Sequence, residues 1–140
     1  MILIDTSVLI PVAQVSHMHH RPSRDFFNFL ERKKSAISAH TMAEVYATLT
    51  AMPPAVRLTP SEVIVVMETF LKRLTPVSLS PEEYMETLRS TAKLGHSSGM
   101  IYDALHLACA RKINAEYIYT WNLKNFRSLA PDLADRIITP

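Results

Sequence analysis

The chain has 140 residues, of which 48% are hydrophobic and 20% charged, the size and balance of one globular domain with a core. Fifteen Lys and Arg against thirteen Asp and Glu leave a formal charge of only +2, which excludes a polybasic tail or a strongly cationic nucleic-acid clamp. The two glycines, Gly95 and Gly99, build no glycine-rich loop, which excludes a P-loop and a dinucleotide-binding fingerprint.

The single cysteine and the apolar runs bear on the location of the protein. Cys109 stands alone, so we expect a small core residue rather than a disulfide, a zinc knuckle or a redox pair. The apolar run at residues 1–4 stops at Asp5 without a basic leader, so we expect no secretory signal. No run of about 18 uncharged apolar residues is present to span a membrane. We therefore expect a protein of the reducing cytoplasm.

Apolar runs and helix-start signals predict strands that alternate with helices. In chain order we expect a strand at 1–4, a helix at 8–15, a polar break at 17–22, a helix at 23–34, a strand at 35–39, a helix at 41–51, a strand at 76–79, a helix at 100–113 and strands at 116–120 and 136–139. Two more helices are expected after Thr59 and Ser80, where Thr or Ser, Pro and Glu form capping boxes. The alternation predicts an α/β sandwich on a mostly parallel sheet, within a single domain at residues 1–140.

Asp103 lies in the almost uncharged segment 100–113, where a charge is unexpected. A helix that is apolar all round is buried, and an unpaired buried carboxylate destabilises the fold. Asp103 stands inside the expected helix and so is not its N-cap. It is either a carboxylate that is paired with an arginine or exposed at a helix edge, or a metal-binding or catalytic carboxylate, which we favour.

Two more acidic residues follow the first two expected strands. Asp5 comes directly after the first strand, where it is either an ordinary N-cap or part of a site at the carboxyl edge of the sheet. Glu44 forms a capping box with Thr41 in the first turn of the next helix, which taken alone favours a purely structural role. In a parallel sheet, however, Asp5, Glu44 and Asp103 can converge at one edge.

Three converging carboxylates would repel one another unless a cation joined them. Oxygen ligands suit Mg²⁺ or Mn²⁺, whereas one cysteine and scattered histidines make zinc the weaker choice. Such a site performs phosphoryl-transfer chemistry, because the ion activates water and neutralises the leaving oxygen. The acidic residues therefore predict a divalent-cation site that acts on a phosphodiester.

Four segments of the chain, taken in order, resemble the PIN-domain nucleases, and above all the VapC-type toxins of bacterial and archaeal toxin–antitoxin pairs. With the ending at residues 137–140, the resemblance covers essentially the whole chain. The segments are ILIDTSVL at 2–9, AEV at 43–45, YDALHLA at 102–108 and YTWNLKNF at 119–126.

The resemblance implies a three-layer α/β/α fold and a Mg²⁺- or Mn²⁺-dependent endoribonuclease. It also implies a homodimer, and inhibition by a small antitoxin protein whose tail enters the acidic pocket, often through an arginine. Asp5, Glu44 and Asp103 match the acidic, metal-binding positions of the family. Thr6 matches the small hydroxyl residue beside the first acid and Thr120 the hydroxyl residue before the last site position, so we expect both to bind substrate.

One part of the sequence departs from the family pattern. Many members carry a fourth acid where this chain has the amides Asn122 and Asn125. We expect Asn122 to be a catalytic and substrate-binding residue that positions water or phosphate, with a turn or cap after the strand as the alternative. Because the amides add no charge, a second metal ion would bind more weakly, and the number of ions stays open.

The missing acid also motivates a second hypothesis, a PIN-like protein with weak or no catalysis that serves as an RNA- or partner-binding regulatory module. Two other α/β families are excluded by the residues after the first strand. A receiver domain needs an acidic pair there, and a phosphatase of the haloacid-dehalogenase type needs a second Asp where this chain has Ser7.

Three further features have structural interpretations that compete with functional ones. The histidines of residues 17–20 are expected in a solvated loop. His106 lies one helical turn from Asp103, so it is either a core or helix-edge histidine or a residue that orients Asp103. Trp121 either packs against the fold or stacks on an RNA base.

Overall fold

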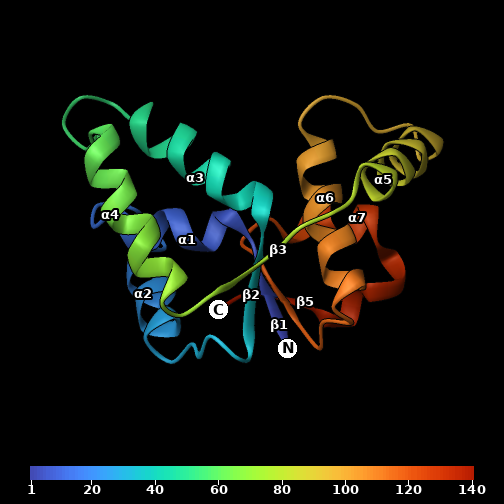
Figure 1. Cartoon of the computed structure of the whole chain (residues 1–140), viewed down its shortest axis with the longest axis horizontal. Helices are drawn as coiled ribbons and strands as arrows, with labels where there is room; N and C mark the ends of the chain where they lie inside the picture. Colours follow the sequence, from blue (N-terminus) through green and yellow to red (C-terminus); the bar gives the residue numbers. More distant parts are fainter.

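A five-stranded sheet forms the centre of the computed structural model, which describes residues 1–140 (Figure 1). The strand order is β3-β2-β1-β4-β5, and every pair of neighbouring strands is parallel. The predicted parallel sheet is therefore confirmed. The strands are β1 (Ile2–Ile4), β2 (Ser35–Ser38), β3 (Thr75–Val77), β4 (Ile118–Tyr119) and β5 (Ile137–Ile138).

Helices cover both faces of this sheet. Figure 1 shows α1 to α4 on one side of the strands and α5 to α7 on the other, so the expected three-layer α/β/α architecture is confirmed. None of the helices combines the length and the hydrophobicity that a membrane crossing requires. The helices are α1 (Thr6–Ala13), α2 (His20–Asn28), α3 (Ala39–Thr50), α4 (Pro60–Leu71), α5 (Pro81–Lys93), α6 (Met100–Lys112) and α7 (Leu123–Leu129), followed by the 3₁₀ helix η1 (Pro131–Arg136).

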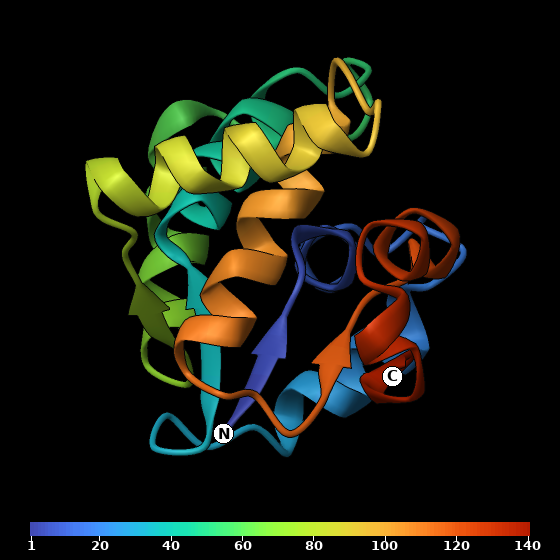
Figure 2. The ribbon, with the colours of Figure 1, turned by 90° about the vertical axis from the view of Figure 1, so that its right-hand side faces the viewer.

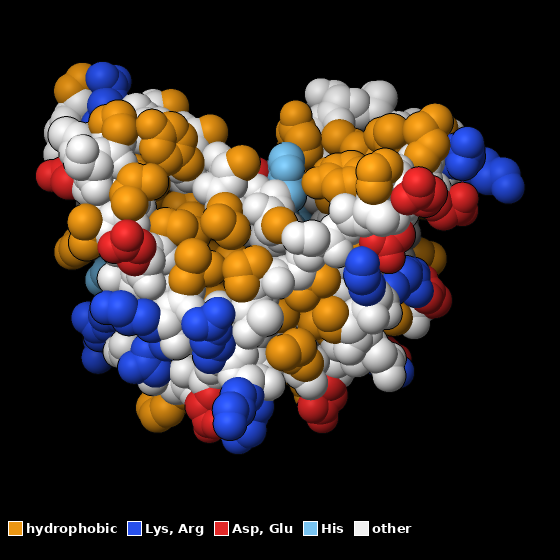
Figure 3. Space-filling model, in the orientation of Figure 1, with side chains coloured by type: hydrophobic (Ala, Val, Ile, Leu, Met, Phe, Trp, Pro, Cys, Tyr) orange, Lys and Arg blue, Asp and Glu red, His pale blue; other side chains and the backbone are white.

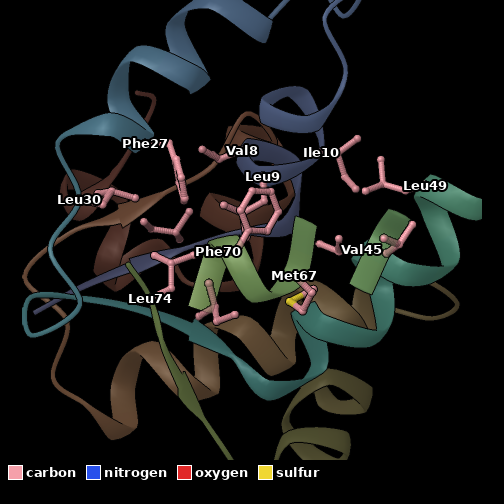
Figure 4. Packing of buried hydrophobic residues seen from close by; sticks show 13 residues of the cluster. Val8, Leu9, Ile10, Phe27, Leu30, Val45, Leu49, Met67, Phe70 and Leu74 are labelled. Carbon is pink, nitrogen blue, oxygen red and sulfur yellow. The ribbon is translucent and has the colours of Figure 1, made fainter. Parts of the chain in front are cut away.

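The core consists of two hydrophobic clusters, one on each face of the sheet. Successive strand residues point to opposite faces, so Leu3 packs in one cluster and Ile4 in the other. Figure 4 shows the larger cluster, in which Phe27 of α2 and Phe70 of α4 meet edge to face with ring centroids 5.2 Å apart. Cys109 is 1% exposed in the other cluster, as its apolar surroundings in the sequence predict.

The two predicted capping boxes are present at the starts of α4 and α5. The Thr59 amide donates to Glu62 Oε2 over 2.7 Å, and the Ser80 amide donates to Glu83 Oε2 over 2.6 Å. In both boxes the glutamate amide donates back to the cap hydroxyl. These contacts link atoms only three residues apart, which is why the sequence predicts them correctly.

The capping box predicted for Thr41 and Glu44 is wrong. Helix α3 begins at Ala39, and its N-cap is Ser38, whose hydroxyl accepts a hydrogen bond from the Thr41 amide over 3.1 Å. Glu44 therefore lies in the second turn of α3, not in the first. Its carboxylate is free of the helix start and is available for contacts with other elements.

Other element boundaries also differ from the predictions. Helix α1 starts at Thr6, directly after its N-cap Asp5, and ends at Ala13. Helix α2 begins at His20, earlier than predicted, because Pro22 is tolerated in a first turn whose backbone N–H groups have no helical partner. The helix ends at Asn28, six residues before the predicted end. Helix α7 and η1 occupy residues 123–136, for which the pattern predicts no helix.

A hollow opens between the two helical layers. Figure 2 shows the strands running from the end of the molecule where the N-terminus lies toward the opposite end, and in the space-filling view of Figure 3 the hollow opens at that opposite end, so the carboxyl ends of the strands face it. In Figure 3 apolar side chains gather on both walls, over α3 and α4 on one side and over α5 and α6 on the other, and a histidine lies at the floor. Residues that follow β1, β2 and β4 are thus placed around one concave region.

Candidate active site

Asp5 follows β1 directly and is 4% exposed. Its Oδ2 accepts hydrogen bonds from the Ser7 hydroxyl over 2.6 Å, from the Ser7 amide over 3.3 Å and from the Thr120 hydroxyl over 2.8 Å. Its other oxygen, Oδ1, lies 3.5 Å from Nε2 of His106. Asp5 is therefore the N-cap of α1 and at the same time belongs to a cluster of acidic residues.

Glu44 reaches that cluster from the second turn of α3. Its Oε2 accepts hydrogen bonds from the Thr6 hydroxyl and from Nε2 of His106, each over 2.7 Å. Burial by itself raises the pKa of Glu44, but the hydrogen bond and charge of His106 and the hydrogen bond of Thr6 outweigh it and hold this pKa below its ordinary value. Glu44 is thus stabilised as a carboxylate.

Asp103 lies in the first turn of α6 and is partly buried rather than fully enclosed. Its Oδ2 accepts hydrogen bonds from Nδ2 of Asn122 over 3.2 Å and from Nδ2 of Asn125 over 3.1 Å. It forms no salt bridge, so pairing with an arginine does not explain its position. Burial and the negative charges of Asp5 and Glu44 raise the pKa of Asp103 from 3.8 to about 6.

The three carboxylates share one pattern of hydrogen bonding. In each of them one oxygen accepts hydrogen bonds from neighbouring donors, and the second oxygen accepts none: Oδ1 of Asp5, Oε1 of Glu44 and Oδ1 of Asp103. Donors on one oxygen fix the orientation of the group, and the second oxygen keeps its lone pairs for another ligand.

Oxygen donors of this kind suit a hard divalent cation such as Mg²⁺ or Mn²⁺. As placed, no group of three His, Cys, Asp or Glu side chains is close enough to hold one ion. The donor chemistry therefore fits a divalent cation, and ligation of one ion by all three of Asp5, Glu44 and Asp103 requires these side chains to lie closer together than they do here.

His106 is joined to the acidic cluster in a way that the sequence analysis missed. The side chain is 1% exposed, and its Nε2 contacts Glu44 and Asp5. His106 therefore contacts two acids other than Asp103, the acid that the sequence suggested it orients. Burial lowers the pKa of His106, but the hydrogen bond to Glu44 and the charges of the acids outweigh it and raise this pKa above its ordinary value. The only signal in the sequence is a polar ring in an apolar helix.

Thr6 and Thr120, both expected to bind substrate, each hydrogen-bond to an acidic residue. Thr6 donates to Glu44. Thr120 is 0% exposed, and its hydroxyl donates to Asp5 and accepts a hydrogen bond from the backbone N–H of Asn122 over 2.9 Å. Asn122 occupies the N-cap position of α7 but makes no side-chain cap, because its amide nitrogen donates to Asp103.

Trp121 and the histidine segment pack against each other at the edge of this region. The ring of His19 stacks on Trp121 with centroids 3.9 Å apart and planes at 4°, and Nε1 of Trp121 donates to Ser23 over 2.9 Å. This arrangement favours the packing interpretation of Trp121. The segment is a partly exposed loop, as expected, and one face of the half-buried His19 ring is covered by Trp121.

Comparison with known proteins identifies the chain. The family model described as "PIN domain" matches residues 2–130. The chain belongs to the PIN-domain family. This PIN domain is also 30% identical to ribonuclease VapC27 of Mycobacterium tuberculosis over 114 residues, which are 81% of this chain and 79% of that protein. The resemblance to VapC-type toxins that the sequence indicates is thus confirmed.

Solved structures show the same fold at low sequence identity. VapC20 of M. tuberculosis, described as a sarcin–ricin loop cleaving toxin, superposes with a TM-score of 0.73 at 13% identity, over 89% of this chain and 92% of that one. VapBC2 of Rickettsia felis, solved with a DNA fragment from its promoter, gives a TM-score of 0.61 at 18% identity, over 99% of this chain and 97% of that one. Both superpositions support the VapC-type PIN fold of this chain.

Proposed function

We propose that this PIN domain is the endoribonuclease toxin of a toxin–antitoxin pair and hydrolyses RNA phosphodiesters at Asp5, Glu44 and Asp103. The observation that carries the proposal is the convergence of these three acids, each with one carboxylate oxygen that accepts no hydrogen bond. A bound Mg²⁺ or Mn²⁺ would supply the Lewis acid that activates water and neutralises charge on the phosphate.

Residues that lie beside the site orient Asp5 and Glu44. Ser7 and Thr120 hold Asp5, and Thr6 holds Glu44 together with His106. Each of these donors approaches one oxygen only, so the other oxygen keeps a defined direction. Ligands that are already restrained lose less side-chain freedom when a cation binds, so these contacts would favour binding even though the acids must still move closer together to share one ion.

Asn122 and Asn125 set the charge of the site. Both amide nitrogens donate to Oδ2 of Asp103, so they orient that acid rather than add a fourth carboxylate. Three carboxylates more than neutralise one divalent cation and leave a single negative charge, so a second divalent cation would be bound more weakly. We therefore propose a mechanism with one cation, in which Asn122 also positions water or phosphate.

The partners follow from the relatives. VapC27 is named a ribonuclease, and a Klebsiella pneumoniae structure with a TM-score of 0.63 at 19% identity is a toxin–antitoxin complex that matches 90% of each chain. These names support RNA as the substrate of this chain and a small antitoxin protein as its partner. We further propose a homodimer in the cytoplasm, with the antitoxin tail entering the acidic pocket.

The test measures RNA cleavage by the purified protein with Mg²⁺ or Mn²⁺, with and without EDTA. We expect cleavage that EDTA abolishes and that Asp5→Asn and Asp103→Asn reduce by orders of magnitude. Asp25→Asn is the matched control, because Asp25 is an exposed aspartate paired with Arg24 on α2. Cleavage that survives chelation or both site substitutions would refute the mechanism.

The alternative is a PIN domain with weak or no catalysis that binds RNA or a partner, which the two amides favour because they add no charge. Expression of the protein without an antitoxin distinguishes the two functions. Growth arrest that disappears with Asp5→Asn rejects the alternative. RNA binding without cleavage or growth arrest supports it.

A further inference from the structure

His106 connects the acidic cluster to the start of α3. Its Nε2 lies 2.7 Å from Oε2 of Glu44 and 3.5 Å from Oδ1 of Asp5. On the other side of the ring, Nδ1 lies 2.8 Å from the hydroxyl of Ser38. That hydroxyl is also the N-cap of α3, the helix that carries Glu44. A hydrogen-bonded chain thus runs from the cap of α3 through His106 to Glu44.

The ring has little freedom to move. The side chain is 1% exposed, and the ring of Phe126 lies nearly parallel to it, at 11° with centroids 6.3 Å apart. Both ring nitrogens are within hydrogen-bond distance of a partner. A buried ring held at both nitrogens and packed on its face transmits its own position to the group that it contacts.

The hydrogen-bond partners of His106 determine that Nε2 carries a proton. An ionised glutamate only accepts hydrogen bonds, so the 2.7 Å contact places a proton on Nε2. Nδ1 either accepts from the Ser38 hydroxyl or donates to it, since a hydroxyl serves in both ways. The contact to Glu44 is therefore the same in the neutral and the charged form of the ring.

We propose that His106 is a positioning residue that sets the direction of the Glu44 carboxylate toward the cation site. Its proton and that of Thr6 both approach Oε2, which leaves Oε1 as the oxygen that turns to the cation. His106 itself touches neither RNA nor the cation, because its side chain is buried and both nitrogens are engaged. This inference rests on the proposed function, since it names how one of that site's ligands is oriented.

The test compares two substitutions at one position. His106→Leu removes the donor, whereas His106→Gln keeps an N–H donor at the distance of Nε2. The readout is the Kd for Mn²⁺ alone, from the electron paramagnetic resonance signal of free Mn²⁺, with circular dichroism to establish folding. His96→Leu is the matched control, because His96 lies in the loop between α5 and α6.

Loss of an outer partner of a metal ligand typically weakens metal binding by about 10–100-fold, and we expect His106→Leu to fall in that range. His106→Gln is expected to recover most of the affinity, and His96→Leu to match the parent protein. A folded His106→Leu with unchanged Mn²⁺ affinity overturns the proposal, and so does a His106→Gln that binds as weakly as His106→Leu. If the leucine variant does not fold, Ser38→Ala decides: weaker Mn²⁺ binding supports the proposal, and unchanged binding overturns it.

Asp5→Asn and RNA cleavage separate this inference from the proposed function. If the parent protein cleaves no RNA, yet its Mn²⁺ affinity depends on both Asp5 and His106, the nuclease proposal fails and the positioning role stands. If it cleaves RNA and His106→Leu binds Mn²⁺ normally, the positioning role fails alone. A parent protein that binds no Mn²⁺ yet cleaves RNA refutes the positioning role alone, and one that neither binds Mn²⁺ nor cleaves RNA with either ion refutes both.

Discussion

Replacement of Asp103 by asparagine tests whether the acidic cluster destabilises the fold when no cation is bound. Asparagine has nearly the same shape, and its side-chain oxygen can still accept from Asn122 and Asn125, which donate to Oδ2 in the parent chain. The substitution therefore removes the charge and keeps the contacts. We expect Asp103→Asn to be more stable than the parent protein at neutral pH in EDTA.

The magnitude follows from the pKa of Asp103, which burial and the charges of Asp5 and Glu44 raise from 3.8 to about 6. At about 1.36 kcal/mol for each pH unit, this rise corresponds to about 3 kcal/mol. Because solvent screens a partly exposed side chain, we reduce the figure to about 1–2 kcal/mol. The folded state binds this proton more tightly than the unfolded chain, so the destabilisation is absent below about pH 3.8 and complete above about pH 6.

The assay is urea denaturation in EDTA from about pH 4.5 to 8, for the parent protein, Asp103→Asn and the control Asp25→Asn. The free energy of unfolding of Asp103→Asn should exceed that of the parent by about 1–2 kcal/mol at pH 7.5, and the difference should shrink toward low pH. Added Mn²⁺ should stabilise the parent more than the variant. A variant that is no more stable at pH 7.5, or a difference that does not change with pH, refutes the reasoning.

Three more substitutions test separate parts of the structure. Asn122→Asp replaces a hydrogen-bond donor to Asp103 by a like charge, so we expect the free energy of unfolding, from urea denaturation in EDTA at pH 7.5, to fall by about 1 kcal/mol. The added carboxylate should also lower the Kd for Mn²⁺, and equal stability would show that the two groups do not interact. His40→Phe keeps the stacking on Tyr102, at 4.8 Å between centroids, and removes a buried Nε2 that has no hydrogen-bond partner. Thermal denaturation should therefore show a free energy of unfolding about 1 kcal/mol higher, and a lower value would indicate that His40 makes a favourable contact with Glu44. Ser80→Ala removes the cap of α5 and should lower stability by about 1 kcal/mol with unchanged RNA cleavage, and a change in cleavage would contradict the assignment of this helix start to stability alone.

Part of the fold follows from patterns that span only a few residues. The capping boxes at Thr59 and Ser80 join atoms three residues apart, and the starts of α4 and α5 are predicted correctly for that reason. Glu44 shows the limit of such patterns. It stands three residues after Thr41 as a capping-box glutamate does, yet Ser38 takes the cap because β2 ends there.

The acidic residues were recognisable from the sequence because their positions conflict with their surroundings. Asp103 stands in an apolar helix and Asp5 at the end of a buried strand, and the spacing of both resembles one family. That family is confirmed, whereas the roles given to the individual residues stay predictions. The family pattern predicts which residues lie close together, but it does not predict which of their atoms form hydrogen bonds.

The sequence by itself determined the alternation of strands and helices, the family, and the three acids and two amides of the candidate site. Only the tertiary structure decided which oxygen of each acid is held: Asp5 is held from 115 residues away by Thr120, and Glu44 from 62 residues away by His106. The physical reason is that local patterns depend on backbone atoms within one turn, whereas these hydrogen bonds depend on the order of the strands. The order β2-β1-β4 brings the segments after these strands side by side, and the orientation of the acids follows from that arrangement.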